Sequence, residues 1–481
     1  MAGVFHNYDV RGIFEKDIDE LFAQKLGVST IEFLDAKSVV IGHDERIGSN
    51  ILAAAIHSAI DVVYDGKVKV IDIGLCTTPM VWHAVGMHKT DCGIMVTASH
   101  NPKEYVGFKI CTKNAIPIGY DNGLDKIEKL VQKSNFAKVI TNNKILFDED
   151  ISTDSEKKHY KKFSEQLLPF VPDQSPLKII ADCSNGAVAP ILVSLLAGTR
   201  HELILINDNP DGNFPAHEPN PLIESTTQEL SELVVQERAD VGVIFDGDAD
   251  RVVFVDEKGN RIRCDFISAL LGKSLIEREN LKKALIKNKR KETSHNTNSH
   301  TSKPIVLADL RSSKIVEEII TQSGGQLFLT KVGRPHIIKQ LHETKGLVAG
   351  ELSGHYYFHD FFCCDDGVRA FLEIMQILAS SQKKFSEIVL ELEKYANSSE
   401  TNVRVTDVKV VLSAIKQEYQ TKKPIKIMEL DGISVYFEEF WFNVRGSNTE
   451  PLLRINMEAD NKKILDEQFA TLIAFIKKFM N

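Results

Sequence analysis

A buried strand followed by an amphipathic helix occurs three times along this 481-residue chain, and the repeat limits the possible folds more than any other feature. We expect the three strands at residues 38–44, 177–182 and 305–309, and the helices at about 50–63, 187–196 and 313–323. Each helix precedes a further strand and a turn, at 68–74, 203–208 and 326–333. Apolar strands that alternate with helices are typical of parallel α/β units. The pattern therefore predicts three related α/β domains in series.

The C-terminal part of the chain has a different pattern. An amphipathic helix at 368–379 leads to strand-like stretches at 433–437, 441–444 and 453–457 and a closing helix at about 464–479, which together predict a smaller α+β domain. A chain of this length is too long for one core and suggests three or four domains of about 100–150 residues each. We therefore expect four domains, at residues 1–150, 151–257, 258–370 and 371–481.

Two polar segments have the composition of connections between domains. Residues 142–161 are polar and charged, and we expect them to lead into the second domain. Residues 288–303 are polar and of low complexity, which is typical of a surface loop rather than a packed element.

The net charge of −9 and the seven cysteines limit the partners and the compartment. An acidic chain has no long-range attraction for nucleic acid, so an anionic ligand must be held by a local cluster of cations. The cysteines are odd in number and form no C-x-x-C pair, which favours a reducing, cytoplasmic compartment over a disulfide framework or a zinc site. We see no signal peptide and no apolar run near the roughly 20 residues that span a bilayer, so we expect no membrane association.

The Ser99 loop, T-A-S-H-N-P at residues 97–102, follows an apolar run and holds a serine at the end of a buried strand. Pro102 keeps the loop from becoming helical. Such a serine is a hydrolase nucleophile, a phosphoryl carrier or part of a plain surface turn. The hydrolase elbow requires G-x-S-x-G, which Thr97 and Asn101 break, and His100 is too close in sequence to fold back as the base of a triad.

The Asp246 loop, D-G-D-A-D-R at residues 246–251, lies between two apolar strands. Asp246, Asp248 and Asp250 offer the hard oxygen ligands that Mg²⁺ or Ca²⁺ prefers. An EF-hand is excluded because its turn glycine would fall at Arg251 and its flanks would be helices. Three carboxylates repel one another without a cation, so we expect a metal site, with an acidic hairpin turn as the alternative. Arg251 adds a positive charge that suits a phosphate oxygen.

Two later loops have the side chains of a binding site. In the Glu351 loop, G-E-L-S-G-H at residues 350–355, Glu351 and Ser353 point the same way from an extended segment and suit two adjacent sugar hydroxyls. In the Arg445 loop, R-G-S-N-T-E-P at residues 445–451, an arginine and three short polar side chains suit a phosphate. Taken alone, each loop is equally compatible with an ordinary polar turn.

Together, and in this order, the four loops resemble those of the α-D-phosphohexomutase family over nearly the whole chain. Supporting segments are Y-D-V-R-G at 8–12, G-H-D-E-R at 42–46, P-D-G-N-F-P at 210–215 and D-D-G at 365–367. The leucine in G-E-L-S-G-H is closer to the pattern of the bacterial phosphomannomutase/phosphoglucomutase enzymes than to that of the phosphoglucosamine mutases. The resemblance implies four domains around a deep central cleft, with one loop from each domain facing it.

The resemblance also implies a role for each matching residue. Ser99 would carry the phosphoryl group, and Mg²⁺ would be bound by Asp246, Asp248, Asp250 and the phosphate on Ser99. Around that phosphate we expect the further catalytic residues Arg11, His100, Lys109 and Arg251, with Lys109 in proton transfer. The sugar would be held by Glu351 and Ser353, with His355 nearby, and the phosphate that does not react by Arg445, Ser447, Asn448 and Thr449. Tyr8 and Arg311 complete the expected substrate-binding set.

The chain departs from the family pattern at three positions near this expected site. Val106 stands where an asparagine is usual, Arg311 where a lysine is frequent, and Arg334 where many members have a histidine, with His336 close enough to replace it. Lys109 must have a lowered pKa to exchange protons, and we expect Arg11 and the metal to lower it.

The implied reaction is reversible phosphoryl transfer between the 1- and 6-positions of mannose or glucose phosphate through Ser99 and a hexose 1,6-bisphosphate. We expect Mg²⁺ as cofactor, glucose or mannose 1,6-bisphosphate as activator, small hexose phosphates as partners and a monomer or weak homodimer. The alternatives are a phosphoglucosamine mutase, a Mg²⁺-dependent sugar phosphatase that uses the same serine, and a non-catalytic protein that binds sugar phosphates.

Overall fold

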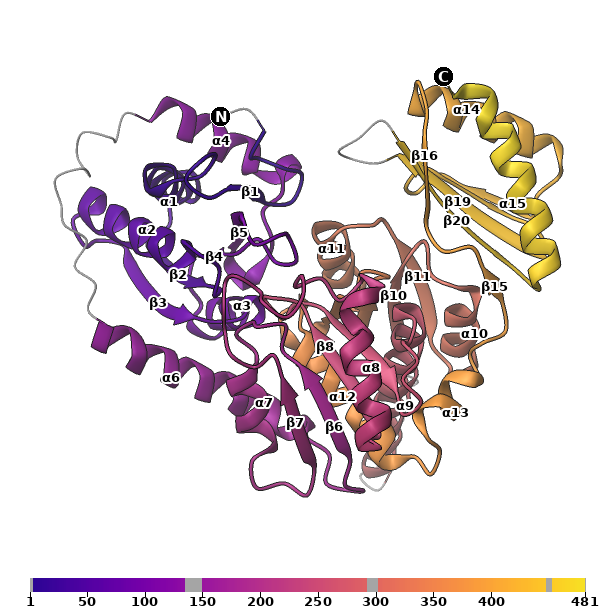
Figure 1. Cartoon of the computed structure of the whole chain (residues 1–481), viewed down its shortest axis with the longest axis horizontal. Coiled ribbons are helices and arrows are strands. Elements are labelled where there is room, and N and C mark those ends of the chain that lie inside the picture. Colours follow the sequence, from indigo (N-terminus) through magenta and orange to yellow (C-terminus); the bar gives the residue numbers. More distant parts are fainter. Residues whose placement is uncertain (1–2, 135–148, 292–301, 447–451, 481) are drawn as a thin grey trace.

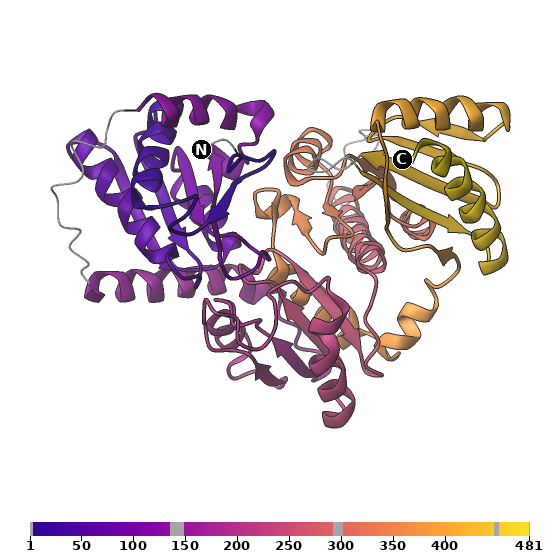
Figure 2. The ribbon, with the colours of Figure 1, turned by 45° about the horizontal axis from the view of Figure 1, so that its top comes forward.

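The computed structural model describes residues 3–134, 149–291, 302–446 and 452–480. These residues form four units, each with its own sheet, that follow one another along the chain (Figures 1 and 2). The predicted architecture of three related α/β units and a differently built C-terminal unit is confirmed.

The first unit has a five-stranded sheet in the order β1-β5-β4-β2-β3. Its strands are β1 (Val10–Ile13), β2 (Ser38–His43), β3 (Lys69–Leu75), β4 (Cys92–Val96) and β5 (Tyr105–Thr112). Its helices are α1 (Glu20–Leu34), α2 (Ser49–Tyr64), α3 (Thr78–His88) and α4 (Leu124–Lys133). Helices α1, α2 and α4 share one core with the sheet, while α3 belongs to a larger core that extends into the second and third units.

The second and third units repeat the central part of this plan. The second sheet has the order β7-β6-β8-β9 and the third β11-β10-β12-β13-β14. The strands of the second unit are β6 (Lys178–Asp182), β7 (Glu202–Ile206), β8 (Val241–Phe245) and β9 (Val252–Asp256), and its helices are α7 (Ala189–Leu196) and α8 (Gln228–Glu237). The strands of the third unit are β10 (Ile305–Asp309), β11 (Gln326–Thr330), β12 (Val348–Gly350), β13 (Tyr356–Phe358) and β14 (Cys364–Asp365). Its helices are α9 (Cys264–Lys291), α10 (Lys314–Gln322), α11 (Arg334–Thr344) and α12 (Gly367–Ser380).

The three α/β units place their functional loops at equivalent positions. In each sheet a central strand pairs in parallel with the next two strands along the chain, and the second of these then pairs with an antiparallel strand. The Ser99, Asp246 and Glu351 loops follow β4, β8 and β12, and each leads into the antiparallel strand. Ligands of α/β proteins bind at the carboxyl ends of parallel strands, so this shared position explains why the three loops face one site.

The fourth unit is an antiparallel sheet covered by helices. Its strands are β15 (Ala396–Asn397), β16 (Thr401–Arg404), β17 (Lys426–Met428), β18 (Ile433–Tyr436), β19 (Phe440–Gly446) and β20 (Leu452–Ala459). Helices α14 (Val408–Thr421) and α15 (Lys462–Ile476) pack in its core, and α13 (Phe385–Leu390) precedes it. Arg445 lies near the end of β19, so this unit also has a predicted site residue at the end of a strand.

Two predicted connections differ from the structure. From Glu149 onward the segment predicted as a connection is helix α6 (Glu149–Leu167), because Phe163 and Leu167 are buried in the core that the first three units share. Helix α9 continues to Lys291, so the beginning of the predicted loop at 288–303 is helical. The remaining parts of these predictions, residues 142–148 and 292–301, lie outside the described residues.

Several element ends have a clear local cause. In the strand and turn predicted at 326–333, strand β11 ends at Thr330, and Gly333, with a φ of 116°, is the N-cap of helix α11. Asp19 and Asp366 cap the N-termini of α1 and α12 by accepting hydrogen bonds from backbone N–H groups, which satisfies donors that a helix leaves free. Within the described residues, no helix combines the length and the apolar character required to cross a membrane.

Candidate active site

A cavity of about 790 Å³ opens where the loops of the four units meet. Six arginines and two glutamates line it, so positive charge concentrates there although the whole chain is acidic. The predicted residues in its lining are His100, Arg251, Arg311, Ser353 and Arg445. A cavity of this size and charge suits a small anionic ligand, as the sequence predicted.

Ser99 lies against the Asp246 loop, although the two are far apart in the sequence. Its Oγ donates a hydrogen bond to Asp246 Oδ2 at 2.9 Å and lies 3.2 Å from His100 Nδ1. The serine is buried, and its φ of 53° is in the left-handed region, which is unfavourable for a residue with a Cβ. A strained backbone of this kind persists only where surrounding contacts hold it.

The Asp246 loop forms a compact group of carboxylates. Asp246, Asp248 and Asp250 each offer an oxygen atom, and these atoms lie within 4.8 Å of one another with all three residues buried. Lys109 Nζ lies 2.6 Å from Asp248 Oδ2 and 2.5 Å from Asp250 Oδ2. The other oxygen of Asp248, Oδ1, has no hydrogen-bond partner among the described residues. Three converging carboxylates with a free buried oxygen fit a hard divalent cation such as Mg²⁺.

The carboxylates of this loop repel one another. Burial, together with the charges of Asp250 and Asp248, raises the pKa of Asp246 well above its usual range. Burial also acts to raise the pKa of Asp250, but Lys109 and His355 outweigh it and hold this pKa well below its usual range. A divalent cation would offset the mutual repulsion that raises the pKa of Asp246.

The expected lowering of the pKa of Lys109 is wrong for this arrangement. Burial acts to lower the pKa, but the charges of Asp248 and Asp250 outweigh burial and raise it above its ordinary value. Arg11 opposes these aspartates only weakly, because it is the smallest of the effects on Lys109. Lys109 is therefore held as an ammonium ion by the carboxylates that it bridges.

Arg11 contacts the Ser99 loop from strand β1. Its Nη1 donates hydrogen bonds to the carbonyl oxygen of Ala98 at 3.2 Å and to Asn101 Oδ1 at 2.5 Å. Asp9 accepts from its Nε at 2.9 Å and orients the guanidinium. Tyr8, two residues earlier than Val10, lies instead beside the third unit, where its hydroxyl contacts the carbonyl oxygen of Val332 at 3.4 Å.

The Glu351 loop is tied to its own unit and to the Asp246 loop. Glu351 accepts hydrogen bonds from Gly333 N at 3.1 Å and from Tyr357 Oη at 2.7 Å. Burial acts to raise the pKa of Glu351, but His355 and Tyr357 outweigh it and lower the pKa to about 2. Ser353 Oγ lies 2.8 Å from His355 Nδ1. The predicted pair of a carboxylate and a hydroxyl is therefore assembled around one imidazole.

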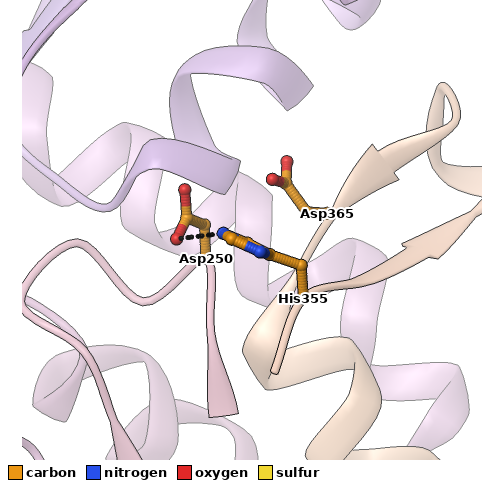
Figure 3. Close-up of side chains that lie close together, drawn as sticks. All are labelled: Asp250, His355 and Asp365. Atoms are coloured by element: carbon orange, nitrogen blue, oxygen red, sulfur yellow. Dashed lines mark ion pairs between the residues drawn. The ribbon is translucent and has the colours of Figure 1, made fainter. Parts of the chain in front are cut away.

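His355 joins the loops of the second and third units (Figure 3). Its Nε2 lies 3.3 Å from Asp250 Oδ1 and 3.2 Å from Arg251 Nε. Burial acts to lower the pKa of His355, but Asp250 and Glu351 raise it to about 9. Asp365 completes this group, but Arg334 already donates to both of its oxygens, at 2.9 and 3.0 Å. This second cluster is therefore an ion-pair network rather than an open metal site.

The residues that depart from the family pattern occupy different places. Arg334 is paired with Asp365 and stacks over the ring of Trp82 at 4.5 Å. It therefore joins the third unit to the first. His336, the suggested replacement for the missing histidine, lies beside the ring of Tyr8, with 6.2 Å between their ring centroids. Val106 is buried in β5 and offers only packing.

The fourth unit and Arg311 meet at a carboxylate that sequence reasoning did not single out. Glu400 lies 3.3 Å from Arg311, 3.1 Å from Arg445 and 3.2 Å from Arg454. No motif surrounds this glutamate, and only its position in the folded chain shows its partners. Ser447, Asn448 and Thr449, predicted for the same site, lie outside the described residues.

Comparisons with known proteins agree with this architecture. Four family models match successive parts of the chain: the alpha/beta/alpha domains I, II and III of phosphoglucomutase/phosphomannomutase at residues 2–138, 158–259 and 268–395, and the C-terminal domain at 400–474. The chain belongs to the phosphoglucomutase/phosphomannomutase family. It is therefore a hexose-phosphate mutase, an enzyme of the isomerase class.

Relatives and solved structures of this family cover the chain almost completely. A phosphomannomutase of Methanocaldococcus jannaschii is 36% identical over 99% of this chain and 98% of that protein. A phosphomannomutase of Escherichia coli is 29% identical over 98% of this chain and 99% of that protein. A phosphoglucomutase/phosphomannomutase family protein of Burkholderia thailandensis has the same fold, with a TM-score of 0.82 at 22% identity over 99% of this chain and 98% of that one.

Two more distant structures of the same fold contain ligands. An N-acetylphosphoglucosamine mutase of Aspergillus fumigatus in complex with glucose 1,6-bisphosphate has a TM-score of 0.56 at 14% identity, with 100% of this chain and 96% of that one covered. The enzyme in complex with GlcNAc-6P and magnesium has a TM-score of 0.54 at 17% identity, with 83% of this chain and 93% of that one covered.

Proposed function

We propose that this mutase transfers a phosphoryl group between the 1- and 6-positions of mannose and glucose phosphates, with Ser99 as the carrier. The observation that carries the proposal is the 2.9 Å hydrogen bond from Ser99 Oγ to Asp246, which puts the serine beside three buried carboxylates. Phosphoryl transfer requires alignment and neutralisation of charge, and this corner of the cleft offers both.

The carboxylates of Asp246, Asp248 and Asp250 would hold Mg²⁺ together with the phosphate on Ser99. When bound, the metal supplies positive charge to the transferring phosphoryl group. Arg11 orients the Ser99 loop from one side, and Arg251 presents a guanidinium to the cavity from the other. His100 lines the cavity next to the serine, and we propose that it orients the Ser99 hydroxyl.

We propose that Lys109 donates a proton near Ser99, because Asp248 and Asp250 hold it as an ammonium ion beside the carrier. Glu351 and Ser353 would hold two adjacent sugar hydroxyls, a grip that tolerates both orientations of a bisphosphate. His355 supports this grip through its contact with Ser353. The sugar can thus turn end for end without a second binding site.

The phosphate that does not react would bind at the opposite end of the cavity. Arg445 and Arg311 line that end, and we propose Ser447, Asn448 and Thr449 as additional hydrogen-bond donors. Tyr8 would contact the substrate from the rim between the first and third units. Glucose or mannose 1,6-bisphosphate would act as the activator that phosphorylates Ser99.

We also propose the domain boundaries 1–150, 151–257, 258–370 and 371–481, a cytoplasmic compartment, and a monomer or weak homodimer. Neither nucleic acid nor a membrane is part of the proposed function. The acidic net charge of −9 supports the first exclusion, because it repels a polyanion outside the arginine-lined cleft.

The test is a substrate panel with defined products. The protein is incubated with Mg²⁺, a trace of glucose 1,6-bisphosphate and, in turn, the 1-phosphates of mannose, glucose and N-acetylglucosamine. We expect the 6-phosphates of mannose and glucose, with rates that rise with the bisphosphate. Formation of inorganic phosphate without a bisphosphate requirement would support a phosphatase instead, and conversion of the N-acetylglucosamine compound alone would contradict the proposed substrates.

A further inference from the structure

Arg46, at the end of the G-H-D-E-R segment, has its side chain completely buried against the Ser99 loop and the start of β5. Its guanidinium donates to four backbone carbonyl oxygens there. These are the carbonyls of Ser99 at 2.6 Å, Asn101 at 2.6 Å, Pro102 at 2.9 Å and Tyr105 at 3.0 Å. One side chain thus binds the backbone on both sides of the loop.

Only an arginine can make this set of contacts. Its planar guanidinium has five N–H donors in a fixed fork, whereas a lysine has three donors that diverge from a single nitrogen. Nη1 serves the carbonyls of Pro102 and Tyr105, and Nη2 serves those of Ser99 and Asn101. The geometry of the fork therefore determines how far apart the two ends of the loop lie.

The buried charge of Arg46 is compensated on two sides. Asp44 Oδ2 lies 3.4 Å from its Nε, and Asp44 is itself held by a 2.6 Å hydrogen bond from Ser49 Oγ. On the other side the ring of Phe214, from the second unit, lies 4.8 Å from the guanidinium carbon. A cation that is paired, stacked and hydrogen-bonded through both of its terminal nitrogens is stable in the interior.

The approach of Phe214 requires a glycine nearby. A Cβ at Gly212 would lie 2.5 Å from the carbonyl oxygen of Glu45 and 2.6 Å from the nitrogen of Ile47. Because no side chain fits there, the segment at 210–215 can lie directly on the backbone around Arg46. The second unit therefore closes over the arginine that holds the loop of the first unit.

We propose that Arg46 is a positioning residue for the phosphoryl carrier. Ser99 has a left-handed φ of 53°, and its own carbonyl oxygen accepts one of the shortest of the four hydrogen bonds. The arginine holds this conformation and so directs Ser99 Oγ toward Asp246. Arg46 does not touch the substrate in this role, and the inference rests on the proposed function of Ser99.

The test is Arg46→Lys in the full-length protein. The variant keeps the positive charge but cannot donate to four carbonyls. Because a misplacement of about 1 Å at a reacting group can cost roughly 100-fold, we expect turnover to fall by about 30- to 100-fold. The KM for the hexose 1-phosphate should stay within about twofold, since Glu351, Ser353 and Arg445, which would hold the sugar and its second phosphate, lie in the third and fourth units.

Arg369→Lys is the matched control. Arg369 is equally buried, pairs with Glu373 at 2.7 Å and lies over the ring of Phe170, but it has no contact with the Ser99 loop. We expect a similar loss of thermal stability and a turnover within about threefold of wild type. Hydrogen exchange should be faster at residues 98–105 in Arg46→Lys and unchanged there in Arg369→Lys. A merely structural effect would not separate the two variants in this way.

We also measure how much phosphate Ser99 takes up from glucose 1,6-bisphosphate. This measurement distinguishes a wrong role for Arg46 from a wrong role for Ser99. If wild type takes up no phosphate at Ser99, the carrier role falls and this inference with it. If wild type is phosphorylated and both lysine variants keep the same turnover, the proposed function stands and the positioning role is refuted. If Arg46→Lys does not fold, the variant Phe214→Leu is tested in its place. We expect its turnover to fall only about three- to tenfold, because the guanidinium of Arg46 still donates to the loop while the ring that covers it is lost.

Discussion

The two ends of the cleft are built differently. At the end with Ser99, the proposed phosphoryl carrier, completely buried groups hold the loop, among them Arg46 with contacts as short as 2.6 Å. At the other end Arg311, Arg445 and Arg454 meet at Glu400, whose side chain is 28% exposed and lies 3.1–3.3 Å from them. The first end is fixed by hydrogen bonds in one geometry, while at the second end three arginines are paired with one partly exposed carboxylate, which we propose a phosphate displaces.

This difference agrees with the roles that we propose for the two ends. Transfer at Ser99 would require alignment of the reacting atoms to within a fraction of an ångström. The second phosphate would need only enough positive charge to be held, and it would have to be released when the bisphosphate turns around. The two ends also differ in charge. The end with Ser99 is rich in carboxylates that suit a cation, and the other end is rich in arginines that suit a phosphate.

Ser99→Ala tests the reacting end with the largest expected effect. Removal of the carrier hydroxyl should lower turnover by about 1,000-fold or more, while the thermal unfolding midpoint changes by only a few degrees. Turnover is measured with the coupled 6-phosphate assay and folding by circular dichroism. Near-normal turnover in this variant would contradict the carrier role of Ser99, and with it the proposed difference in function between the two ends.

Asp248→Asn tests whether the carboxylates at this end form the metal site. The loss of one charge and of a buried oxygen ligand should weaken Mg²⁺ binding by about 10- to 100-fold, measured by calorimetry and by the Mg²⁺ dependence of turnover. Asp240→Asn is the control, because Asp240 precedes the same strand at its opposite end and accepts a hydrogen bond from Lys178 N. An equal effect of both variants would contradict a localised site.

Glu400→Gln tests the end of the cleft where three arginines meet at one carboxylate. Without this charge the three arginines are available to anions, so inorganic phosphate should inhibit turnover about two- to fivefold more strongly, the effect of a partly exposed ion pair. Glu224→Gln is the control, since Glu224 lines the same cavity but has no ion pair with these arginines. If both variants strengthen inhibition equally, the effect comes from the overall charge of the cavity and not from displacement of Glu400.

The pH dependence of the free energy of unfolding tests the contact between the first and third units. Of the four changes, this one should affect catalysis least. Burial, reinforced by His88 and His159, lowers the pKa of His83 to about 4, and this ring stacks on Phe361 of the third unit. The unfolded chain binds the proton more readily, so stability falls as the pH drops below 6.5, by about 3 kcal/mol at pH 4. His83→Phe should flatten this part of the curve, measured by urea unfolding from pH 4 to 7. An unchanged slope would contradict the packing role of the neutral imidazole.

Much of the fold was predictable because its signals are local. The apolar strands at 177–182 and 305–309 are observed as β6 and β10, and the helix predicted at 368–379 is α12. The polar segment at 142–161 misled the prediction, because helix α6 has few apolar residues and is stabilised by a core formed from three units. Local composition cannot report burial that other units supply.

The sequence by itself determined the strand and helix repeat, the four loops and the residue types that suit a phosphate, a metal and a sugar. Only the tertiary structure decided their partners: Ser99 meets Asp246 across 147 positions, and Lys109 meets Asp250 across 141. The contact of Arg46 with the Ser99 loop and the convergence of three arginines on Glu400 were likewise visible only in the folded chain. Hydrophobic periodicity and motifs depend on neighbours along the chain. The ion-pair partner of a charged side chain and its pKa depend instead on groups that folding brings together.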